Sequence, residues 1–293
     1  KLKHFRNYNQ ITWIRCVVIT GANSGIGYAA AKIYESKGYF VVLGCRNQEK
    51  GIAAEKEIGK NSKFIKLDMT DYESIDNFYN NLTSNFKNID IFYSNAGIMY
   101  VPFSKTKEGL ESTLATNYFG STYLMLMMLD LMKNVVSSRI VQISSIAMYF
   151  IKEMRYERLE DESIYSPWTW YNYSNLYRTM FSFELDKKIA NFETDVVVAH
   201  PGVTRSRLYR RSNPSLSYKI IDKFKTNVST GVAPVIEAST TAELKKERVY
   251  APKIIHQYGK PSTYKANKLA YNLQERETLW NYTLDKIGMK DIL

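Results

Sequence analysis

The sequence alternates short apolar, β-rich runs with amphipathic helical stretches from its start to about residue 200. Strands that are apolar throughout and separated by helices are typical of a parallel sheet covered on both faces. Right-handed crossovers between such strands give a doubly wound α/β fold. With no internal repeat or linker, we expect one domain over residues 1–293 with six or seven mostly parallel strands. The expected strands are residues 16–20, 40–45, 63–67, 89–94, 139–144, 195–200 and, as a possible seventh, 248–252.

The composition suits a globular chain that needs no covalent staple. Of 293 residues, 45% are hydrophobic and 24% charged, and a chain of this length can bury a substantial core. Cys16 and Cys45 both lie in apolar runs, so we expect buried free thiols and no disulfide. The three histidines are scattered, which argues against a metal site.

The net charge of +11 is compatible with an anionic cofactor, a nucleic acid or a membrane surface. No lysine run is dense and interleaved with aromatic residues, so we expect no nucleic-acid partner. The most apolar stretch, residues 122–132, contains Asp130 and is shorter than the roughly 20 residues that span a bilayer. Because the chain begins at Lys1, an upstream targeting or anchoring segment could be missing. The compartment is therefore undetermined, and the cytoplasm or a reducing organelle is most compatible.

A glycine-rich loop follows the first expected strand. It reads TGANSGIG and contains Thr20, Gly21, Gly25 and Gly27. A strand, a glycine turn and a helix in this order place backbone N–H groups and a helix N-terminus beside a pyrophosphate, as in a Rossmann-type domain. The spacing is G-x-x-x-G-x-G, so the alternative is a tight turn between strand and helix with no ligand.

The second expected strand ends in GCRN, with Arg46. An acidic residue at this place would accept the ribose hydroxyl of NAD, whereas a basic one suits the 2′-phosphate of NADP. The alternative is an arginine that faces solvent. The sequence favours NADP (NADPH), with NAD less favoured.

Seven motifs occur in an order that resembles the short-chain dehydrogenase/reductase family, particularly its retinol-dehydrogenase-like and WW-domain-oxidoreductase-like members. They are TGANSGIG, CRNQEKG, LDMTD, SNAGIM, TNYFG, RIVQISS and HPGVTRS. The resemblance implies an oxidoreductase that transfers hydride between a nicotinamide and a small-molecule carbonyl or alcohol. It also implies a homodimer formed by helices near residues 122–132 and 172–190, and a substrate lid near residues 203–235. The substrate itself is not recoverable.

The resemblance also assigns site residues. It implies that Tyr171 is the catalytic acid or base, that Ser145 orients the substrate carbonyl, and that Asn117 holds a water that relays protons. Structural alternatives remain for three residues: a loop hydroxyl for Ser145, a hydrogen bond at a helix end for Asn117 and a turn residue for Asn95. His200, in HPG, matches a structural histidine at a strand end, so a hydrolase is not expected. The implied cofactor-binding residues are Thr20, Gly21, Asn23, Ser24, Gly25, Ile26, Gly27, Arg46, Asp68, Met69, Asn95, Ala96, Gly97, Asn175, Pro201, Gly202 and Thr204.

One position departs from the family pattern. The segment SNLYRTMFSFEL resembles the family's SKLAN–LF––EL helix, which places Asn175 where the family has the lysine of Tyr-x-x-x-Lys. A nearby cation lowers a pKa by roughly 1–3 units, so Tyr171 loses that help. Arg178 could partly replace the charge, although we favour the interpretation that it does not.

Two hypotheses follow from Asn175. The first is an NADP(H)-dependent reductase in which reduction is favoured, because Tyr171 then acts as a neutral acid. The second is a catalytically impaired relative that binds the cofactor and acts as a sensor or interaction module. The retained Ser145, Tyr171 and Asn117 favour the first.

Overall fold

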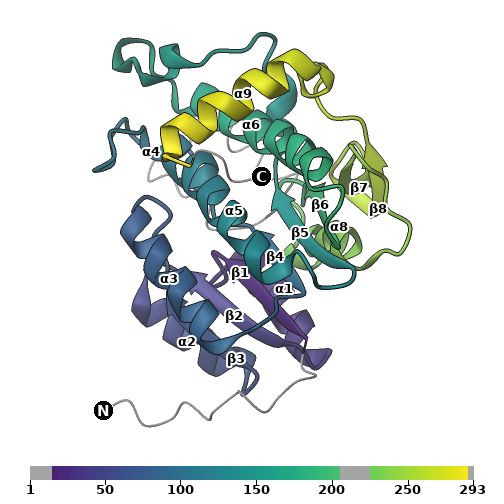
Figure 1. The fold of residues 1–293 in the computed structure, drawn as a ribbon. Coiled ribbons are helices and arrows are strands. Elements are labelled where there is room, and N and C mark those ends of the chain that lie inside the picture. The colour runs from purple at the N-terminus through teal and green to yellow at the C-terminus, as the bar shows by residue number, and fades with distance from the viewer. Residues whose placement is uncertain (1–14, 205–224, 290–293) are drawn as a thin grey trace.

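The computed structural model describes residues 15–204 and 225–289, which form an α/β domain around one eight-stranded sheet (Figure 1). The strand order is β3-β2-β1-β4-β5-β6-β7-β8, and the pairs from β3 to β7 are all parallel. The strands are β1 (Cys16–Thr20), β2 (Phe40–Cys45), β3 (Ser62–Lys66), β4 (Ile91–Ser94), β5 (Ser138–Ile143), β6 (Thr194–Ala199), β7 (Val249–Ile254) and β8 (Tyr258–Tyr264). The doubly wound fold predicted from the apolar runs is confirmed.

The predicted count of six or seven strands was too low because it omitted β8. This strand reads YGKPSTY, and neither its glycine, its proline nor its half-exposed side chains match an apolar run. It pairs antiparallel with β7, with an irregularity between Pro252 and Ile254. Proline is tolerated here because β8 is the last strand of the sheet, where one side needs no hydrogen bonds.

Helices cover both faces of the sheet (Figure 1). One hydrophobic cluster joins the sheet to α3, α5, α6 and α9, and a second joins its other face to α1, α2 and α8. The helices are α1 (Gly25–Ser36), α2 (Gln48–Ile58), α3 (Tyr72–Asn85), α4 (Ser112–Leu114), α5 (Gly120–Met132), α6 (Pro167–Lys188), α8 (Val228–Thr240) and α9 (Leu273–Ile287), with a π-helical turn over Ala115–Phe119.

The starts of several helices are set by side chains that accept hydrogen bonds from the first turn. Asn47 caps α2, Asp71 caps α3, Ser166 caps α6 and Asn272 caps α9. In α6 the cap is followed by Pro167, whose fixed φ and missing N–H suit the first helical position. The segment that carries Tyr171 is therefore locally encoded as a helix.

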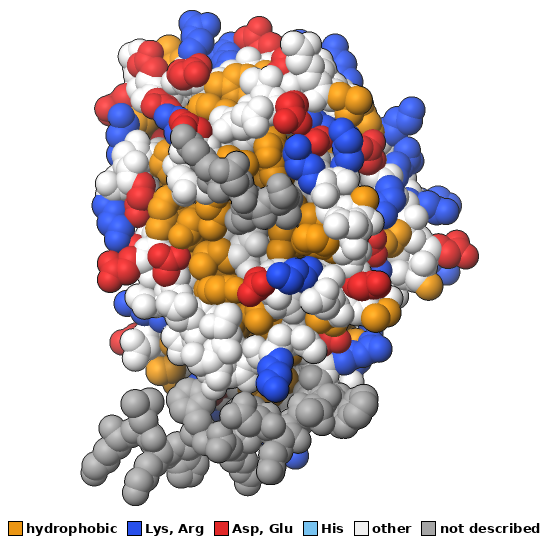
Figure 2. All heavy atoms as spheres, in the orientation of Figure 1, with side chains coloured by type: hydrophobic (Ala, Val, Ile, Leu, Met, Phe, Trp, Pro, Cys, Tyr) orange, Lys and Arg blue, Asp and Glu red, His pale blue; other side chains and the backbone are white. Residues whose placement is uncertain are grey.

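Helix α9 packs lengthwise against α6 (Figure 1). The Trp280 ring stacks on Phe181 with centroids 4.6 Å apart, and every residue of α6 from Trp170 to Leu185 is buried. The predicted homodimer would use α5 and α6, but this chain's own α9 covers that side of α6. On the face of the molecule seen in Figure 2, many hydrophobic side chains lie in the middle and most charged ones lie toward the edges. A homodimer stays a prediction.

Among the helices of residues 15–204 and 225–289, none combines the length and the apolar character that a bilayer span requires. Both cysteines are buried free thiols, as the sequence indicated.

Candidate active site

A pocket of about 540 Å³ lies at the carboxyl ends of the central strands. It is centred where β1 is flanked by β2 and β4, so the chain order of the strands reverses there. Ligands of doubly wound sheets bind at such a switch point, because the two adjoining loops turn to opposite faces and leave a crevice. Most of the predicted site residues line this one pocket.

The glycine loop forms one wall of the pocket. Gly21 and Gly25 have φ of +69° and +60°, a region that disfavours other residues. At Gly27 a Cβ atom would lie 2.6 Å from Asn95 Nδ2 and 2.8 Å from the Gly21 carbonyl oxygen. Ser24, the N-cap of α1, accepts no hydrogen bond from the helix through its side chain. An open helix N-terminus behind a loop without side chains fits a pyrophosphate.

We expect Gly27→Ala to weaken binding of a dinucleotide by roughly 10-fold or more, since the loop must shift and even small displacements of binding groups are costly. Titration of intrinsic fluorescence with NADPH measures the loss. Lys32→Ala, on the exposed side of the same helix, is the control and should bind as the wild type does. Unchanged affinity in Gly27→Ala would contradict this role of the loop.

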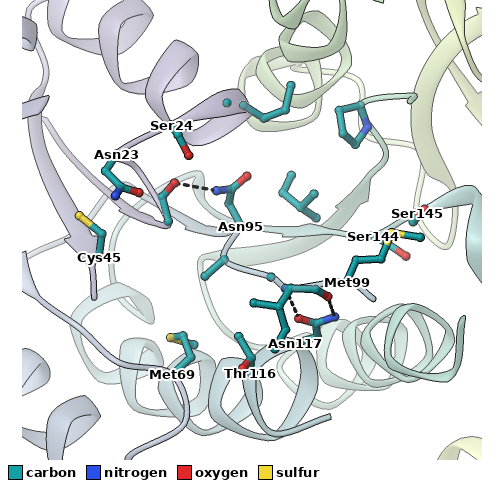
Figure 3. A pocket seen from close by; sticks show the side chains of 18 of the residues that line it. Asn23, Ser24, Cys45, Met69, Asn95, Met99, Thr116, Asn117, Ser144 and Ser145 are labelled. Atoms are coloured by element: carbon teal, nitrogen blue, oxygen red, sulfur yellow. Dashed lines mark hydrogen bonds between the residues drawn. The ribbon is translucent and has the colours of Figure 1, made fainter. Parts of the chain in front are cut away.

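Thr20 and Asn95 join the two loops at the switch point. The Thr20 hydroxyl accepts hydrogen bonds from the backbone N–H groups of Asn95 and Ala96, both 2.9 Å. The Asn95 amide donates to the Thr20 carbonyl at 2.7 Å and points toward the glycine loop (Figure 3). Asn95, Ala96 and Gly97 line the pocket. Thr20 and Gly27 do not line it, and they act by holding the residues that do.

Basic and acidic side chains meet at the end of the pocket beside β2 and β3. Arg46 lies 3.9 Å from Asp68, and its side chain is 70% exposed. Sequence reasoning missed Lys50, which lines the same end from the first turn of α2. Its position four residues after Arg46 in the sequence could have indicated a second cation at this end of the pocket. Two cations beside the N-terminus of α2 form an electropositive end suited to a phosphate.

Asn117 lies in the π-helical turn that precedes α5, a rare geometry frequent at functional sites. Its side chain accepts a hydrogen bond from the Ile98 N–H (2.8 Å) and donates to the Ile98 carbonyl (3.0 Å) (Figure 3). It also donates to the Ser174 hydroxyl at 3.0 Å. Asn117 therefore holds the loop after β4 against α6. Its backbone carbonyl accepts a hydrogen bond from Arg178.

Tyr171 lies on α6 with its ring packed against Met99 and Ala147. Burial raises the pKa of Tyr171, while Ser145, the Arg178 charge and Asn175 each lower it. Ser145 also accepts a hydrogen bond from the Ala147 N–H at 3.2 Å. The Asn175 amide donates to the Tyr171 carbonyl at 2.8 Å. The structure thus brings Tyr171, Ser145, Asn175 and Asn117 to one end of the pocket.

Several further residues line the pocket that were not among the predicted site residues. Most lie within the quoted motifs, but their apolar or small side chains gave no chemical reason to assign them a role. His200 is fully buried, and burial lowers its pKa to about 3, so it is neutral. The additional lining residues are Gly44, Cys45, Asn47, Lys50, Leu67, Ile98, Met99, Val101, Thr116, Ile143, Ser144, Arg178, His200 and Val203.

The predicted lid is described only in part. Pro201, Gly202 and Thr204 line the pocket, and Gln257 holds Val203 through hydrogen bonds to its N–H (2.6 Å) and carbonyl (2.8 Å). Residues 205–224 lie outside the described part of the chain. The last part of the predicted region, from Val228, belongs to α8.

Comparison with known proteins identifies the family. Residues 15–156 match the model described as short chain dehydrogenase. The chain is 31% identical to human retinol dehydrogenase 12 over 282 residues, covering 94% of this chain and 87% of that protein. It belongs to the short-chain dehydrogenase family. It is also 28% identical to human polyprenol dehydrogenase, over 95% of this chain and 86% of that protein. Chicken WW domain-containing oxidoreductase is 30% identical, over 78% of this chain and 59% of that protein.

Solved structures show the same fold. A crystal structure of a protein from Mycobacterium Paratuberculosis is 27% identical and covers 94% of this chain and 93% of its own, with a TM-score of 0.77. A short chain dehydrogenase from Burkholderia cenocepacia, solved in complex with NADP, has a TM-score of 0.64 at 18% identity, over 78% of this chain and 91% of its own. At that identity the second likeness concerns the fold alone.

Proposed function

We propose that this short-chain dehydrogenase is an NADP(H)-dependent enzyme that reduces the carbonyl group of a small molecule to an alcohol. The observation that carries the proposal is the convergence of Tyr171 and Ser145 on the pocket that the glycine loop lines. Binding of the dinucleotide along this pocket, with its adenine end beside Arg46, would bring the nicotinamide to Tyr171.

A bound nicotinamide would supply the hydride, and Tyr171 the proton. Ser145, which lines the same pocket, would hold the carbonyl oxygen beside the Tyr171 hydroxyl. Burial raises the pKa of Tyr171 above its ordinary value, so the hydroxyl is protonated at neutral pH and serves as a general acid. Reduction should therefore persist through neutral pH and fall only at alkaline pH, as the tyrosine loses its proton. Oxidation needs the ionised form and should show the opposite dependence.

Apolar side chains around Tyr171 favour an apolar substrate, and of these Met99 lines the pocket together with Val101. Met99 and Ala147 pack on Tyr171, and Trp168 stacks near its ring with centroids 6.3 Å apart. Tyr100 stacks on Trp168 in turn, at 6.0 Å. Aromatic and aliphatic surfaces of this kind bind apolar molecules and orient them through few polar groups. The names of two relatives, retinol dehydrogenase and polyprenol dehydrogenase, agree with a lipophilic alcohol or carbonyl compound.

The experiment is a reduction assay with NADPH and an apolar aldehyde such as all-trans-retinal, followed by the loss of NADPH absorbance and by product chromatography. Formation of the alcohol supports the proposal. The second candidate, a cofactor-binding protein without catalysis, is favoured by one observation: Asn175 at the family's lysine position offers no charge. Tight NADPH binding without turnover over a panel of apolar and polar carbonyl compounds would favour that candidate.

We expect Arg46→Asp to reverse the cofactor preference. The substitution replaces a cation at the phosphate end of the pocket by an anion, and a hydrogen bond to a charged group is worth about 1.5–3 kcal/mol. NADPH affinity should fall by about 10- to 100-fold, while NADH affinity should hold or rise. Fluorescence titration with both cofactors measures the change. Lys56→Asp, an equal change of charge in the last turn of α2, is the control. Equal weakening of NADPH and NADH by Arg46→Asp would contradict the NADP assignment.

A further inference from the structure

Arg178 lies fully within the protein at the Tyr171 end of the pocket. The residue is 5% exposed and lines the pocket from α6. Its guanidinium donates hydrogen bonds to three backbone carbonyls, those of Ala96, Asn117 and Ile143. These belong to the loop after β4, the π-helical turn and the end of β5. Three separate segments therefore fix the position of this charge.

Arg178 has no anionic partner among the described residues, whose ion pairs do not include it. Buried charges are ordinarily paired, because an uncompensated one is costly. The three carbonyls are neutral, so the positive charge is not cancelled. Burial lowers the pKa of Arg178 only to about 10, and the side chain remains charged at neutral pH. The pocket thus contains a fixed, uncompensated cation.

The sequence around Arg178 suggests what this cation replaces. The family pattern SKLAN has lysine and asparagine where this chain, in SNLYR, has Asn175 and Arg178. The two positions are one turn apart on the same side of α6. Asn175 turns its amide to the Tyr171 carbonyl, while Arg178 reaches the Asn117 carbonyl. The positive charge has moved by three residues along the helix.

We propose that Arg178 supplies the positive charge that assists Tyr171, in place of the lysine absent from position 175. This inference rests on the proposed reductase function and makes Arg178 a positioning residue, which acts through Tyr171. In reduction, hydride adds to the carbonyl carbon as the Tyr171 O–H bond breaks and its proton goes to the carbonyl oxygen. The products are the alcohol, the oxidised nicotinamide and the Tyr171 phenolate, which solvent reprotonates. Arg178 stabilises that phenolate.

The charge should be visible in the ionisation of position 171 without any cofactor or substrate. Tyr171 is replaced by a trifluorinated tyrosine, whose more acidic hydroxyl ionises nearer neutral pH, and its pKa is followed by fluorine NMR. Arg178→Gln keeps a hydrogen-bond donor but removes the charge. We expect it to raise the pKa at position 171 by roughly 1–3 units, the size of a nearby opposite charge. Arg178→Lys should keep most of the wild-type value.

A double variant separates the charge from the structural hydrogen bonds of Arg178. Asn175→Lys combined with Arg178→Gln returns a cation to the family's position. We expect it to bring the pKa at position 171 back toward the wild-type value and to restore most of the reductase activity that Arg178→Gln loses. An equal pKa in Arg178→Gln and wild type would overturn the proposal. So would failure of the double variant to lower the pKa below that of Arg178→Gln. Arg178→Met replaces Arg178→Gln in both comparisons should the latter not fold.

The two proposals fail in different ways. Absence of reductase activity in the wild type would count against the proposed function, while the NMR titration would still show whether Arg178 acts on position 171. Arg178→Gln could raise the pKa at position 171 as expected and yet keep full reductase activity. That result would show that the charge reaches Tyr171 but does not assist it, which also overturns the inference.

Discussion

Replacing the Tyr171 hydroxyl by hydrogen, in Tyr171→Phe, should lower the rate of carbonyl reduction by about 10²- to 10⁴-fold, the usual contribution of a positioned general acid. The ring would keep its contacts with Met99 and Ala147, so neither a cavity nor a change of fold is expected. NADPH affinity should stay close to the wild-type value, because the glycine loop and Arg46 are untouched. Steady-state kinetics with an apolar aldehyde and a fluorescence titration measure the two quantities.

Tyr173→Phe is the matched control for Tyr171→Phe. Tyr173 lies on the same helix, but its hydroxyl donates to the Glu153 carbonyl at 3.0 Å, away from the pocket. Its loss should cost about 1 kcal/mol of stability and leave the reaction intact. Wild-type turnover in Tyr171→Phe, or equal losses in both variants, would show that Tyr171 is not the proton donor.

Arg276→Met should lower the free energy of unfolding by about 1.5–3 kcal/mol, since it removes the charge-assisted hydrogen bonds of a buried guanidinium. Arg276 is 1% exposed. Its guanidinium lies 2.7 Å from Glu247 and 3.9 Å from Glu184 of α6, and donates to the Ala270 carbonyl at 2.6 Å. The contact with Glu184 joins α9 to the helix that carries Tyr171, while the other two join it to the segments beside β7 and before α9. Urea denaturation followed by circular dichroism measures the change.

The control for Arg276→Met is Lys286→Met on the same helix. Lys286 pairs with Glu160, but both side chains are partly exposed to solvent, and such pairs contribute up to about 1 kcal/mol. Similar destabilisation by the two variants would contradict the role given to Arg276. If α9 opened in Arg276→Met without global unfolding, the uncovered face of α6 should favour self-association, which sedimentation would detect.

The strands were predictable where burial on both faces produced continuous apolar runs, as in β1 and β2. β8 was not predictable, because it becomes a strand by pairing with β7 and its own composition does not indicate one. The same distinction applies to the helices. The apolar character of α5 is plain in the sequence, but no local pattern shows that α9, much later in the chain, packs against α6. The expectation of a dimer contact there came from the family resemblance, and it stays a prediction.

The site residues divide in a similar way. Short motifs predicted that Gly21, Asn95 and Tyr171 share one pocket. Gly21 and Asn95 each follow a recognisable strand, and Tyr171 lies in a recognisable helix. The orientation of a side chain is a different matter. The Asn117 amide is used by the Ile98 backbone and Ser174. The position of the Arg178 guanidinium depends on hydrogen bonds to three carbonyls from distant segments. Such contacts arise only from the folded arrangement, so the sequence could not favour Arg178 over an exposed arginine.

The most direct test of the account uses NADPH that carries deuterium at the transferable position of the nicotinamide. The wild-type protein is incubated with this cofactor and an apolar aldehyde, and the product is analysed by mass spectrometry. We expect an alcohol with one deuterium on the carbinol carbon, formed about 10²- to 10⁴-fold more slowly by Tyr171→Phe. Tight binding of the cofactor with no labelled alcohol, over a panel of carbonyl compounds, would contradict the reductase assignment and leave a protein that binds the dinucleotide without using it.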